Sequence, residues 1–338
     1  MREAMFIKKN AARWEQYQKS LPANADEKAE RFTMLIDDLS YSKTFYPKSK
    51  VTKWLNGLTA STYQQLYQNR REKYSRIYTF WLYEVPLLFR KYHRIFLFTT
   101  LFFILSSAIG AFSTKKDPTF VRDILGDQYV QMTERNIERG DPFGVYRDRD
   151  KFTMFLMIAS NNVRVAAMEF LSGITLGLGT IYVLWHNGIM LGSFQYFFFT
   201  KSMGWNSVLV IWIHGTIEII SIILAGVAGL ILANSLLFPG TYTRLQSLRR
   251  SGKDAAKLMI CLVPFIILAA VLESYVTFRM SNYFQTGSKE FIAPWVSILI
   301  LVLSFVLMIG YFVIWPIILE KRGYTLVKSG VERKLKTT

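Results

Sequence analysis

The chain has 338 residues, of which 51% are hydrophobic and only 19% are charged, and its formal net charge is +17. This apolarity, together with uncharged runs that approach 20 residues, excludes an ordinary soluble domain and predicts a polytopic membrane protein. A single cysteine, Cys261, excludes an intrachain disulfide. The basic residues gather in the segments between the apolar runs, so we expect them to set the membrane orientation and expect no nucleic-acid partner.

Residues 1–93 form the first predicted unit, a basic helical domain on the cytoplasmic side. The stretches NAARWEQYQKSL and ADEKAERFTMLIDDLSY place apolar residues three and four positions apart, which is the spacing of an amphipathic helix. Helical spacing resumes after Pro47 and continues to the membrane, with a kink expected at Pro86. We interpret the end of this unit as an amphipathic elbow along the membrane. Its basic residues form either a solvated face or a surface that binds anionic headgroups.

Six apolar segments between residues 94 and 320 are expected to span the membrane, since about 20 residues cross the hydrocarbon core. The first is followed by a polar linker, residues 113–152, with eight Lys and Arg and eight Asp and Glu. The long apolar stretch 152–199 is divided at residues 186–188, the sequence HNG, which makes the third span the shortest. The predicted spans are 95–112, 163–185, 187–203, 208–237, 258–278 and 294–319.

Charge asymmetry predicts the orientation of these spans. The N-terminal domain, the 239–257 loop and the tail 321–338 are basic, whereas the 113–152 linker is neutral. With six spans all three basic segments face the cytoplasm, as the positive-inside rule requires, and five spans would leave one of them outside. We therefore predict an all-α polytopic membrane helix bundle of about six spans, with an N-terminal cytoplasmic helical domain and both termini in the cytoplasm.

The outer linker is expected to be partly helical. Between residues 120 and 138 apolar side chains recur at near-helical spacing, with charges of both signs between them. Such an amphipathic stretch either lies on the outer membrane surface or covers the mouth of the bundle. A solvated helical hairpin is the alternative.

Ionisable residues inside the predicted spans indicate a buried polar cluster, because a charge at membrane depth is costly. His214 and Glu218 are one helical turn apart in the fourth span, and Glu169 and Arg164 lie in the second. We expect these four residues to form one cluster, with a Glu169–His214 contact between two parallel helices. The cluster either only fixes helix packing, or provides an ion or proton pathway, or binds a partner at its outer end. Glu273 is interpreted as a separate interfacial carboxylate.

Small residues four positions apart indicate where helices approach closely in lipid. The candidate packing positions are Gly173 and Gly177 in the second span, Gly188 and Gly192 in the third, and Ala225 and Gly229 in the fourth. Glu169 and Glu218 share faces with the second-span and fourth-span positions, so both acids should point into protein. The third-span pair has no evident partner, so we expect a homodimer, the commonest closed assembly.

Sequence motifs of catalysis are absent. The chain has three histidines and no H-E-x-x-H zinc signature, no G-x-S-x-G nucleophile turn and no phosphate-binding P-loop. We therefore expect no enzymatic activity, no catalytic residue, no cofactor and no metal site.

Two segments of the chain resemble the stage II sporulation protein M family of integral membrane proteins. They are NNVRVAAMEFLSGITLGLGTIYVLWHNGIMLG and HGTIEIISIILAGVAGLILA, and the resemblance is strongest between residues 161 and 234. The positions that carry it are the paired Asn161 and Asn162, the Asn187-Gly188 pair, and an H-G-x-x-E motif formed by His214, Gly215 and Glu218.

The resemblance implies a bacterial or archaeal protein of the cytoplasmic membrane. In spore formers the namesake anchors a peptidoglycan-degrading complex together with two partner proteins. We therefore expect a non-catalytic scaffold of a cell-envelope complex, in contact with the lipid bilayer and with cell-wall hydrolases or other envelope proteins. The alternative is a transporter or channel that uses the buried Glu and His cluster.

Overall fold

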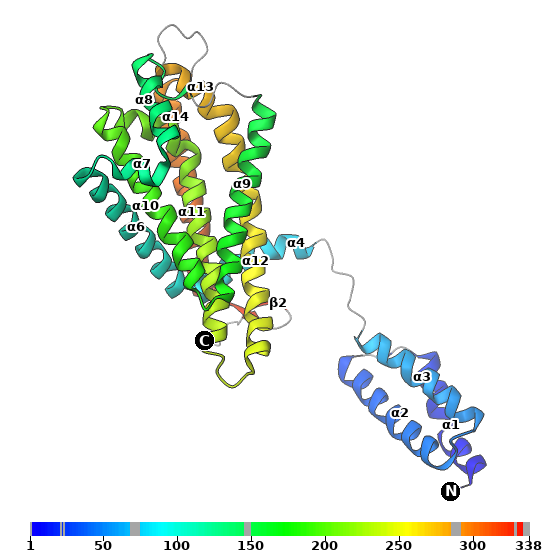
Figure 1. The fold of residues 1–338 in the computed structure, drawn as a ribbon. Helices are drawn as coiled ribbons and strands as arrows, with labels where there is room; N and C mark the ends of the chain where they lie inside the picture. Colours follow the sequence, from blue (N-terminus) through cyan, green and yellow to red (C-terminus); the bar gives the residue numbers. More distant parts are fainter. Residues whose placement is uncertain are drawn as a thin grey trace. The chain divides into compact units, whose positions relative to one another are not determined.

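A computed structural model of the chain describes residues 2–20, 22, 24–67, 75–144, 150–284, 292–327 and 330–333. The chain divides into two compact units, Met1–Arg76 and Ile77–Thr338, and both are built mainly from helices (Figure 1). Residues 77–93, the end of the predicted first unit 1–93, therefore belong with the membrane bundle.

The first unit consists of helices around an apolar core of its own. They are α1 (Glu3–Lys19), α2 (Ala25–Phe45) and α3 (Lys50–Tyr67). Asn24 caps α2 by accepting a hydrogen bond from the amide of Glu27. Asp38 of α2 accepts a hydrogen bond of 2.7 Å from the Trp14 indole and pairs with Arg13 of α1. The buried side chains of the core are Phe6, Trp14, Leu35, Leu39 and Leu55.

The second unit is a bundle of long helices (Figure 1). The entry segment consists of α4 (Ser75–Thr79), a π-helical turn η1 (Phe80–Glu84) and α5 (Val85–Lys91). The long helices are α6 (His93–Lys116), α9 (Lys151–Leu171), α10 (Leu178–Thr200), α11 (Gly204–Leu237), α12 (Arg244–Val271) and α14 (Pro294–Ile309). Shorter elements are the π-helical turns η4 (Leu272–Thr277) and η6 (Gly310–Ile314), the 3₁₀ turn η5 (Asn282–Phe284), and the helices α13 (Phe278–Ser281) and α15 (Trp315–Lys321). The most buried long helix is α11, which contacts α6, α9, α10, α12 and α14.

Four segments in the part of the chain that the structure describes are long and apolar enough to cross a membrane. They are His93–Lys116, Gly204–Leu237, Arg244–Phe284 and Pro294–Lys321. Helices α9 and α10 are not among these four segments, but their 21 and 23 residues reach about 32 and 35 Å, enough for a hydrocarbon core of about 30 Å. The predicted all-α polytopic membrane bundle is confirmed. The count of six spans, which requires α9 and α10 in addition to these four segments, stays a prediction.

The predicted division of the long apolar stretch 152–199 is wrong. The chain turns at residues 172–177, through a 3₁₀ turn η3 (Ser172–Ile174) and a left-handed Gly177 with φ of +90°. The expected break at residues 186–188 lies inside α10, where the Asn187 side chain donates to the Val183 carbonyl. Polar residues that bond within their own helix do not end it. The turn is made where Leu176 (φ +57°) and Gly177 (φ +90°) both take left-handed conformations, which glycine adopts without steric cost.

The helix ends collect at two ends of the bundle. At the first, named the basic end, Lys91 of α5 pairs with Asp254 of α12 at 2.6 Å, and Arg90 pairs with Glu320 of α15 at 2.6 Å. At the other, named the linker end, lie α7 (Phe120–Leu125) and α8 (Asp127–Glu138) (Figure 1). Basic segments far apart in the sequence therefore meet at one end, as the six-span topology requires. The side of the membrane that this end faces stays a prediction.

The basic tail predicted for residues 321–338 contains an antiparallel hairpin. Strand β1 (Tyr324–Val327) pairs with β2 (Gly330–Arg333), with Tyr324 opposite Arg333. The Tyr324 ring lies 5.0 Å from that of Tyr83 in the entry segment. The hairpin thus folds against the basic end of the bundle.

The prediction of a partly helical outer linker is confirmed by α7 and α8, which together with the residues up to 144 form the linker cap. Val121, Val130 and Phe143 of the cap are buried in one apolar cluster with Phe197 and Phe198 of α10. The cap therefore covers the mouth of the bundle.

An ion-pair network adds to the contact between the linker cap and α10. Glu134 of α8 accepts hydrogen bonds of 2.8 Å from Lys201 and 2.9 Å from Arg122. Lys201, with the help of Arg122, holds the pKa of the Glu134 carboxyl below its usual value. Folding of the cap is therefore linked to the ionised form of Glu134.

Candidate functional site

Three ionisable side chains meet inside the bundle near the linker end. His214 and Glu218 come from one face of α11, one turn apart, and Glu273 comes from the π-helical turn η4 that extends α12. One donor atom from each of the three side chains lies within 4.8 Å of the others. The 214–218 pair was predicted from its spacing, whereas Glu273 was interpreted as a separate interfacial carboxylate, which is wrong.

Two uncharged side chains complete this polar cluster. Asn162 of α9 donates a hydrogen bond to Glu218, and Thr277 of η4 bonds with Nδ1 of His214 at 2.9 Å. Nε2 of His214 then faces the Glu273 carboxylate at 3.9 Å. The imidazole is thus held at one nitrogen and directed toward a carboxylate with the other, an arrangement typical of histidines that transfer protons or bind metals.

Two cavities adjoin the cluster. The first, of about 490 Å³, lies between α9, α10 and α11 and is lined by Asn161, Asn162 and Glu218. The second, of about 420 Å³, lies beneath the linker cap and is lined by Tyr129, His214 and Glu218. Asn187 and Glu218 are among the residues that line both cavities. A cluster that only fixed helix packing would not require such space.

The cluster has the donor set of a cation site. One imidazole nitrogen and two carboxylates can bind a divalent cation such as zinc, with bonds of about 2.0–2.2 Å. Two donors on one zinc ion lie about 3.4 Å apart, so the side chains, now within 4.8 Å, would close by roughly an ångström. The same three groups can instead share a proton, because two carboxylates at this separation do not both ionise readily.

Glu169 and Arg164 do not join the cluster, so the predicted Glu169–His214 contact is wrong. Glu169 is fully buried beside Gly226, twelve residues beyond His214 on α11, which is about 18 Å along a helix. Neither carboxylate oxygen of Glu169 has a hydrogen-bond partner among the described residues. Arg164 is exposed on α9. The error follows from the misplaced turn, because a shift of α9 along its axis changes the depth of every residue on it.

The small residues pack helices together, but not all in the predicted pairs. Gly173 faces the Gly229 backbone, where an added Cβ would lie 2.1 Å from the carbonyl oxygen. Gly177 forms the turn after α9, and Ala225 is fully buried in α11. Gly188 and Gly192 meet α6 at Ser106 and Ser107. The third-span pair therefore has a partner within the chain, which removes the reason for expecting a homodimer; the dimer stays an untested prediction.

Gly215 differs from these packing glycines. A Cβ added at this buried position would meet nothing within 4 Å, because the residue borders the cavity beneath the linker cap. The glycine of the H-G-x-x-E motif thus keeps space open beside His214.

Comparison with known proteins identifies the bundle. Residues 99–278, more than half of the chain, match the family described as Stage II sporulation protein M. The chain belongs to this family. The match contains the whole polar cluster, from Asn162 to Thr277. Residues 4–68, which form most of the N-terminal unit, match a separate Domain of unknown function (DUF8413).

A curated relative extends this match to an archaeon. An uncharacterized protein of Methanocaldococcus jannaschii is 26% identical over 193 residues, which cover 56% of this chain and 84% of the relative. No solved structure matches the chain. The relative and the family therefore support a membrane-associated role.

Proposed function

We propose that this protein is a non-catalytic integral membrane scaffold of a prokaryotic cell-envelope complex, with both termini in the cytoplasm. One observation carries the proposal: a family bundle is joined to folded parts that lie outside its spans. The N-terminal unit has its own core, and the linker cap is packed onto the mouth of the bundle. Such parts offer binding surfaces on a fixed membrane anchor.

Family membership supports the same role. The namesake of the family anchors a peptidoglycan-degrading machinery, so cell-wall hydrolases or other envelope proteins are the partners we propose. The linker cap would face these partners outside the membrane, and the N-terminal unit would recruit cytoplasmic proteins or rest on anionic headgroups.

Co-purification from native membranes tests this proposal. The tagged full chain is extracted in a gentle detergent after cross-linking, beside a chain that lacks residues 1–76. We expect an envelope protein, such as a cell-wall hydrolase, to be enriched with the full chain over an unrelated membrane protein of similar abundance. If no envelope protein is enriched with either form, the scaffold proposal is wrong.

A cation or proton pathway is the second candidate, favoured by the cluster of His214, Glu218 and Glu273 between two cavities. Proteoliposomes loaded with a pH-sensitive or a metal-sensitive dye measure flux. Glu218→Gln should abolish flux, because the amide keeps the shape but binds neither a proton nor a cation. Glu169→Gln is the control, since Glu169 is a buried glutamate of the same bundle that lies outside the cluster. Equal flux for the wild type, Glu218→Gln and empty liposomes would exclude the pathway.

A further inference from the structure

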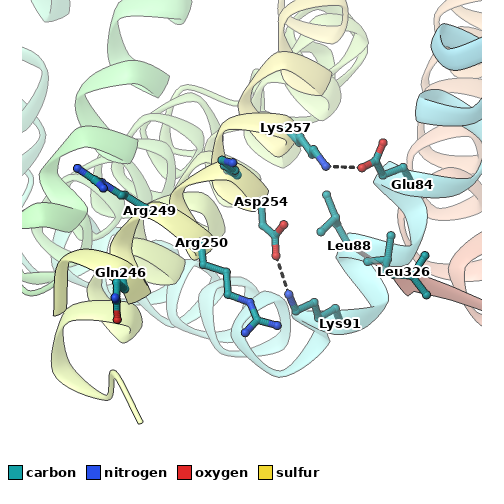
Figure 2. A pocket seen from close by; sticks show the side chains of 11 residues that line it. Glu84, Leu88, Lys91, Gln246, Arg249, Arg250, Asp254, Lys257 and Leu326 are labelled. Carbon is teal, nitrogen blue, oxygen red and sulfur yellow. Dashed lines mark hydrogen bonds and ion pairs between the residues drawn. The ribbon is translucent and has the colours of Figure 1, made fainter. Parts of the chain in front are cut away.

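A cavity of about 560 Å³ opens at the basic end of the bundle. Its walls are α5, the first turns of α12 and strand β1, so segments more than 150 residues apart in the chain build it. Figure 2 shows Arg249, Arg250 and Lys257 extending from α12, with Glu84 and Lys91 opposite on the entry segment. This cavity is named the basic pocket. It shares no lining residue with the polar cluster.

Both acidic residues of the basic pocket are already paired. Lys257 binds Glu84, and Lys91 binds Asp254 at 2.6 Å, as the dashed lines in Figure 2 mark. Asp254 also accepts a hydrogen bond of 2.8 Å from the phenol of Tyr92. Burial and the Asp254 carboxylate raise the pKa of Tyr92, so the phenol remains a donor at neutral pH. Each acid of the pocket is therefore already neutralised by a lysine.

Three cations of the pocket remain without an acidic partner among the described residues: Arg249, Arg250 and Lys253. Arg250 donates to the neutral Tyr242 phenol at 2.8 Å, which leaves its charge uncompensated. All three side chains are exposed. Five basic and two acidic residues give the pocket a net charge of +3.

The position of these cations on α12 is unfavourable for the helix itself. Arg249 and Lys253 are four residues apart, one helical turn, and like charges at this spacing repel. An anion bound in the pocket would relieve this repulsion.

One wall of the pocket is apolar. Leu88 is buried, and Leu326 and Val327 of β1 are half-buried beside it. The cationic side and the apolar side together suit a ligand that is charged at one end and apolar at the other. A purely hydrated anion would use only the arginines and the lysine.

We propose that the basic pocket binds a phosphate-bearing anion, with Arg249, Arg250 and Lys253 as the residues that hold the phosphate. Guanidinium groups bind phosphate oxygens in pairs, and lysine adds a point charge. The hairpin β1–β2 closes the apolar side of the site. The phosphate belongs to a lipid headgroup at the membrane surface or to a soluble phosphate compound, and the two sources are separated by experiment.

The test titrates ligands against delipidated full-length protein in a neutral detergent, with native mass spectrometry to count bound molecules. The probes are phosphatidylglycerol, zwitterionic phosphatidylcholine and inorganic phosphate. The variant Arg249→Gln/Arg250→Gln/Lys253→Gln removes the three cations that have no acidic partner among the described residues. The matched control, Lys116→Gln/Arg139→Gln/Arg279→Gln, removes three exposed charges from the linker end.

We expect the wild type and the control to bind phosphatidylglycerol in preference to phosphatidylcholine, and the triple variant to bind it about tenfold or more weakly, since one charge-assisted hydrogen bond corresponds to about that factor. If inorganic phosphate instead binds the wild type, and the triple variant loses this binding, the site is confirmed and the source is a soluble phosphate. Equal binding of each probe by all three proteins would overturn the proposal. Should the triple variant misfold, Arg250→Gln alone must weaken binding about threefold or more; unchanged binding would count against the site.

Discussion

The crossing of α6 and α10 gives the sharpest prediction about stability. Gly192 of α10 lies so close to α6 that an added Cβ would stand 1.8 Å from the backbone oxygen of Ser107. Ordinary van der Waals contact begins at 3.4 Å, so the two helices would have to separate by about 1.6 Å. Because the obstacle is backbone, no side-chain rotation relieves it. Gly192→Ala should therefore cost about 1–3 kcal/mol, the usual range for overpacking.

Gly215→Ala is the matched control. Both glycines are buried within long helices, but a methyl group added at Gly215 would enter open space. Alanine is the better helix former by roughly 0.5–1 kcal/mol, so this substitution should stabilise the fold. Unfolding followed by tryptophan fluorescence in mixed micelles should separate the two variants in opposite directions from the wild type. If Gly192→Ala unfolds no earlier than Gly215→Ala, the close approach of α6 and α10 does not exist.

Three further expectations concern the linker cap, the polar cluster and the N-terminal unit. Because the folded-state pKa of Glu134 is lowered, its contribution of about 1 kcal/mol should be present above pH ~4.3 and be lost as the pH falls through the folded-state pKa. In melting experiments the difference in stability between Glu134→Gln and the wild type should therefore be full at pH 7 and shrink steadily as the pH is lowered below about 4; a difference that does not change with pH would contradict this. The losses in free energy of unfolding caused by His214→Leu and Glu169→Leu should add within about 0.5 kcal/mol, since the two sites are too far apart to couple. A larger coupling energy in a double-mutant cycle would place Glu169 in the cluster. Residues 1–76 alone should give a helical circular dichroism spectrum with a cooperative melt. Leu55→Ala should abolish both, because loss of a fully buried leucine costs about 2–5 kcal/mol. A helical spectrum that survives the substitution would contradict this core.

Several features could be predicted from the sequence because they depend on short-range spacing. Four-residue spacing placed His214 and Glu218 on one face of α11, and the near-helical spacing of apolar residues in 120–138 predicted the helices of the linker cap. Asn162 was singled out only through the family resemblance, and its hydrogen bond to Glu218 shows what that motif residue does. Features that depend on one helix alone could therefore be predicted from the sequence.

Features that depend on the relative depth of two helices could not be predicted in the same way. The turn at Gly177 was missed because its neighbours are apolar, whereas residues 186–188 contain the polar signals that usually mark a loop. That displacement of the turn moved Glu169 away from His214 and concealed the contact of Gly188 and Gly192 with α6. The basic pocket was missed because its walls come from segments far apart in the chain, which only the fold brings together.

The π-helical turns explain why the position of the Glu273 side chain in particular could not be predicted from the sequence. A π-helical turn inserts one residue into the helical repeat and rotates everything that follows it, so regular spacing no longer tells which face a side chain occupies. Two of these turns have a signal in the sequence: η1 and η6 each end two residues before a proline, Pro86 and Pro316.

The signal at Pro86 has a physical cause. Proline has no amide hydrogen, so the carbonyl of Leu82 loses its helical donor. This carbonyl accepts a hydrogen bond of 2.7 Å from the Trp315 indole instead, and the neighbouring Trp81 carbonyl accepts one from the Tyr311 phenol. The same turn contains Glu84, the partner of Lys257 at the basic pocket. No proline follows η4, which carries Glu273 to His214. The two sites of this bundle are thus both built on interrupted helices, and only one of the interruptions is marked by a proline.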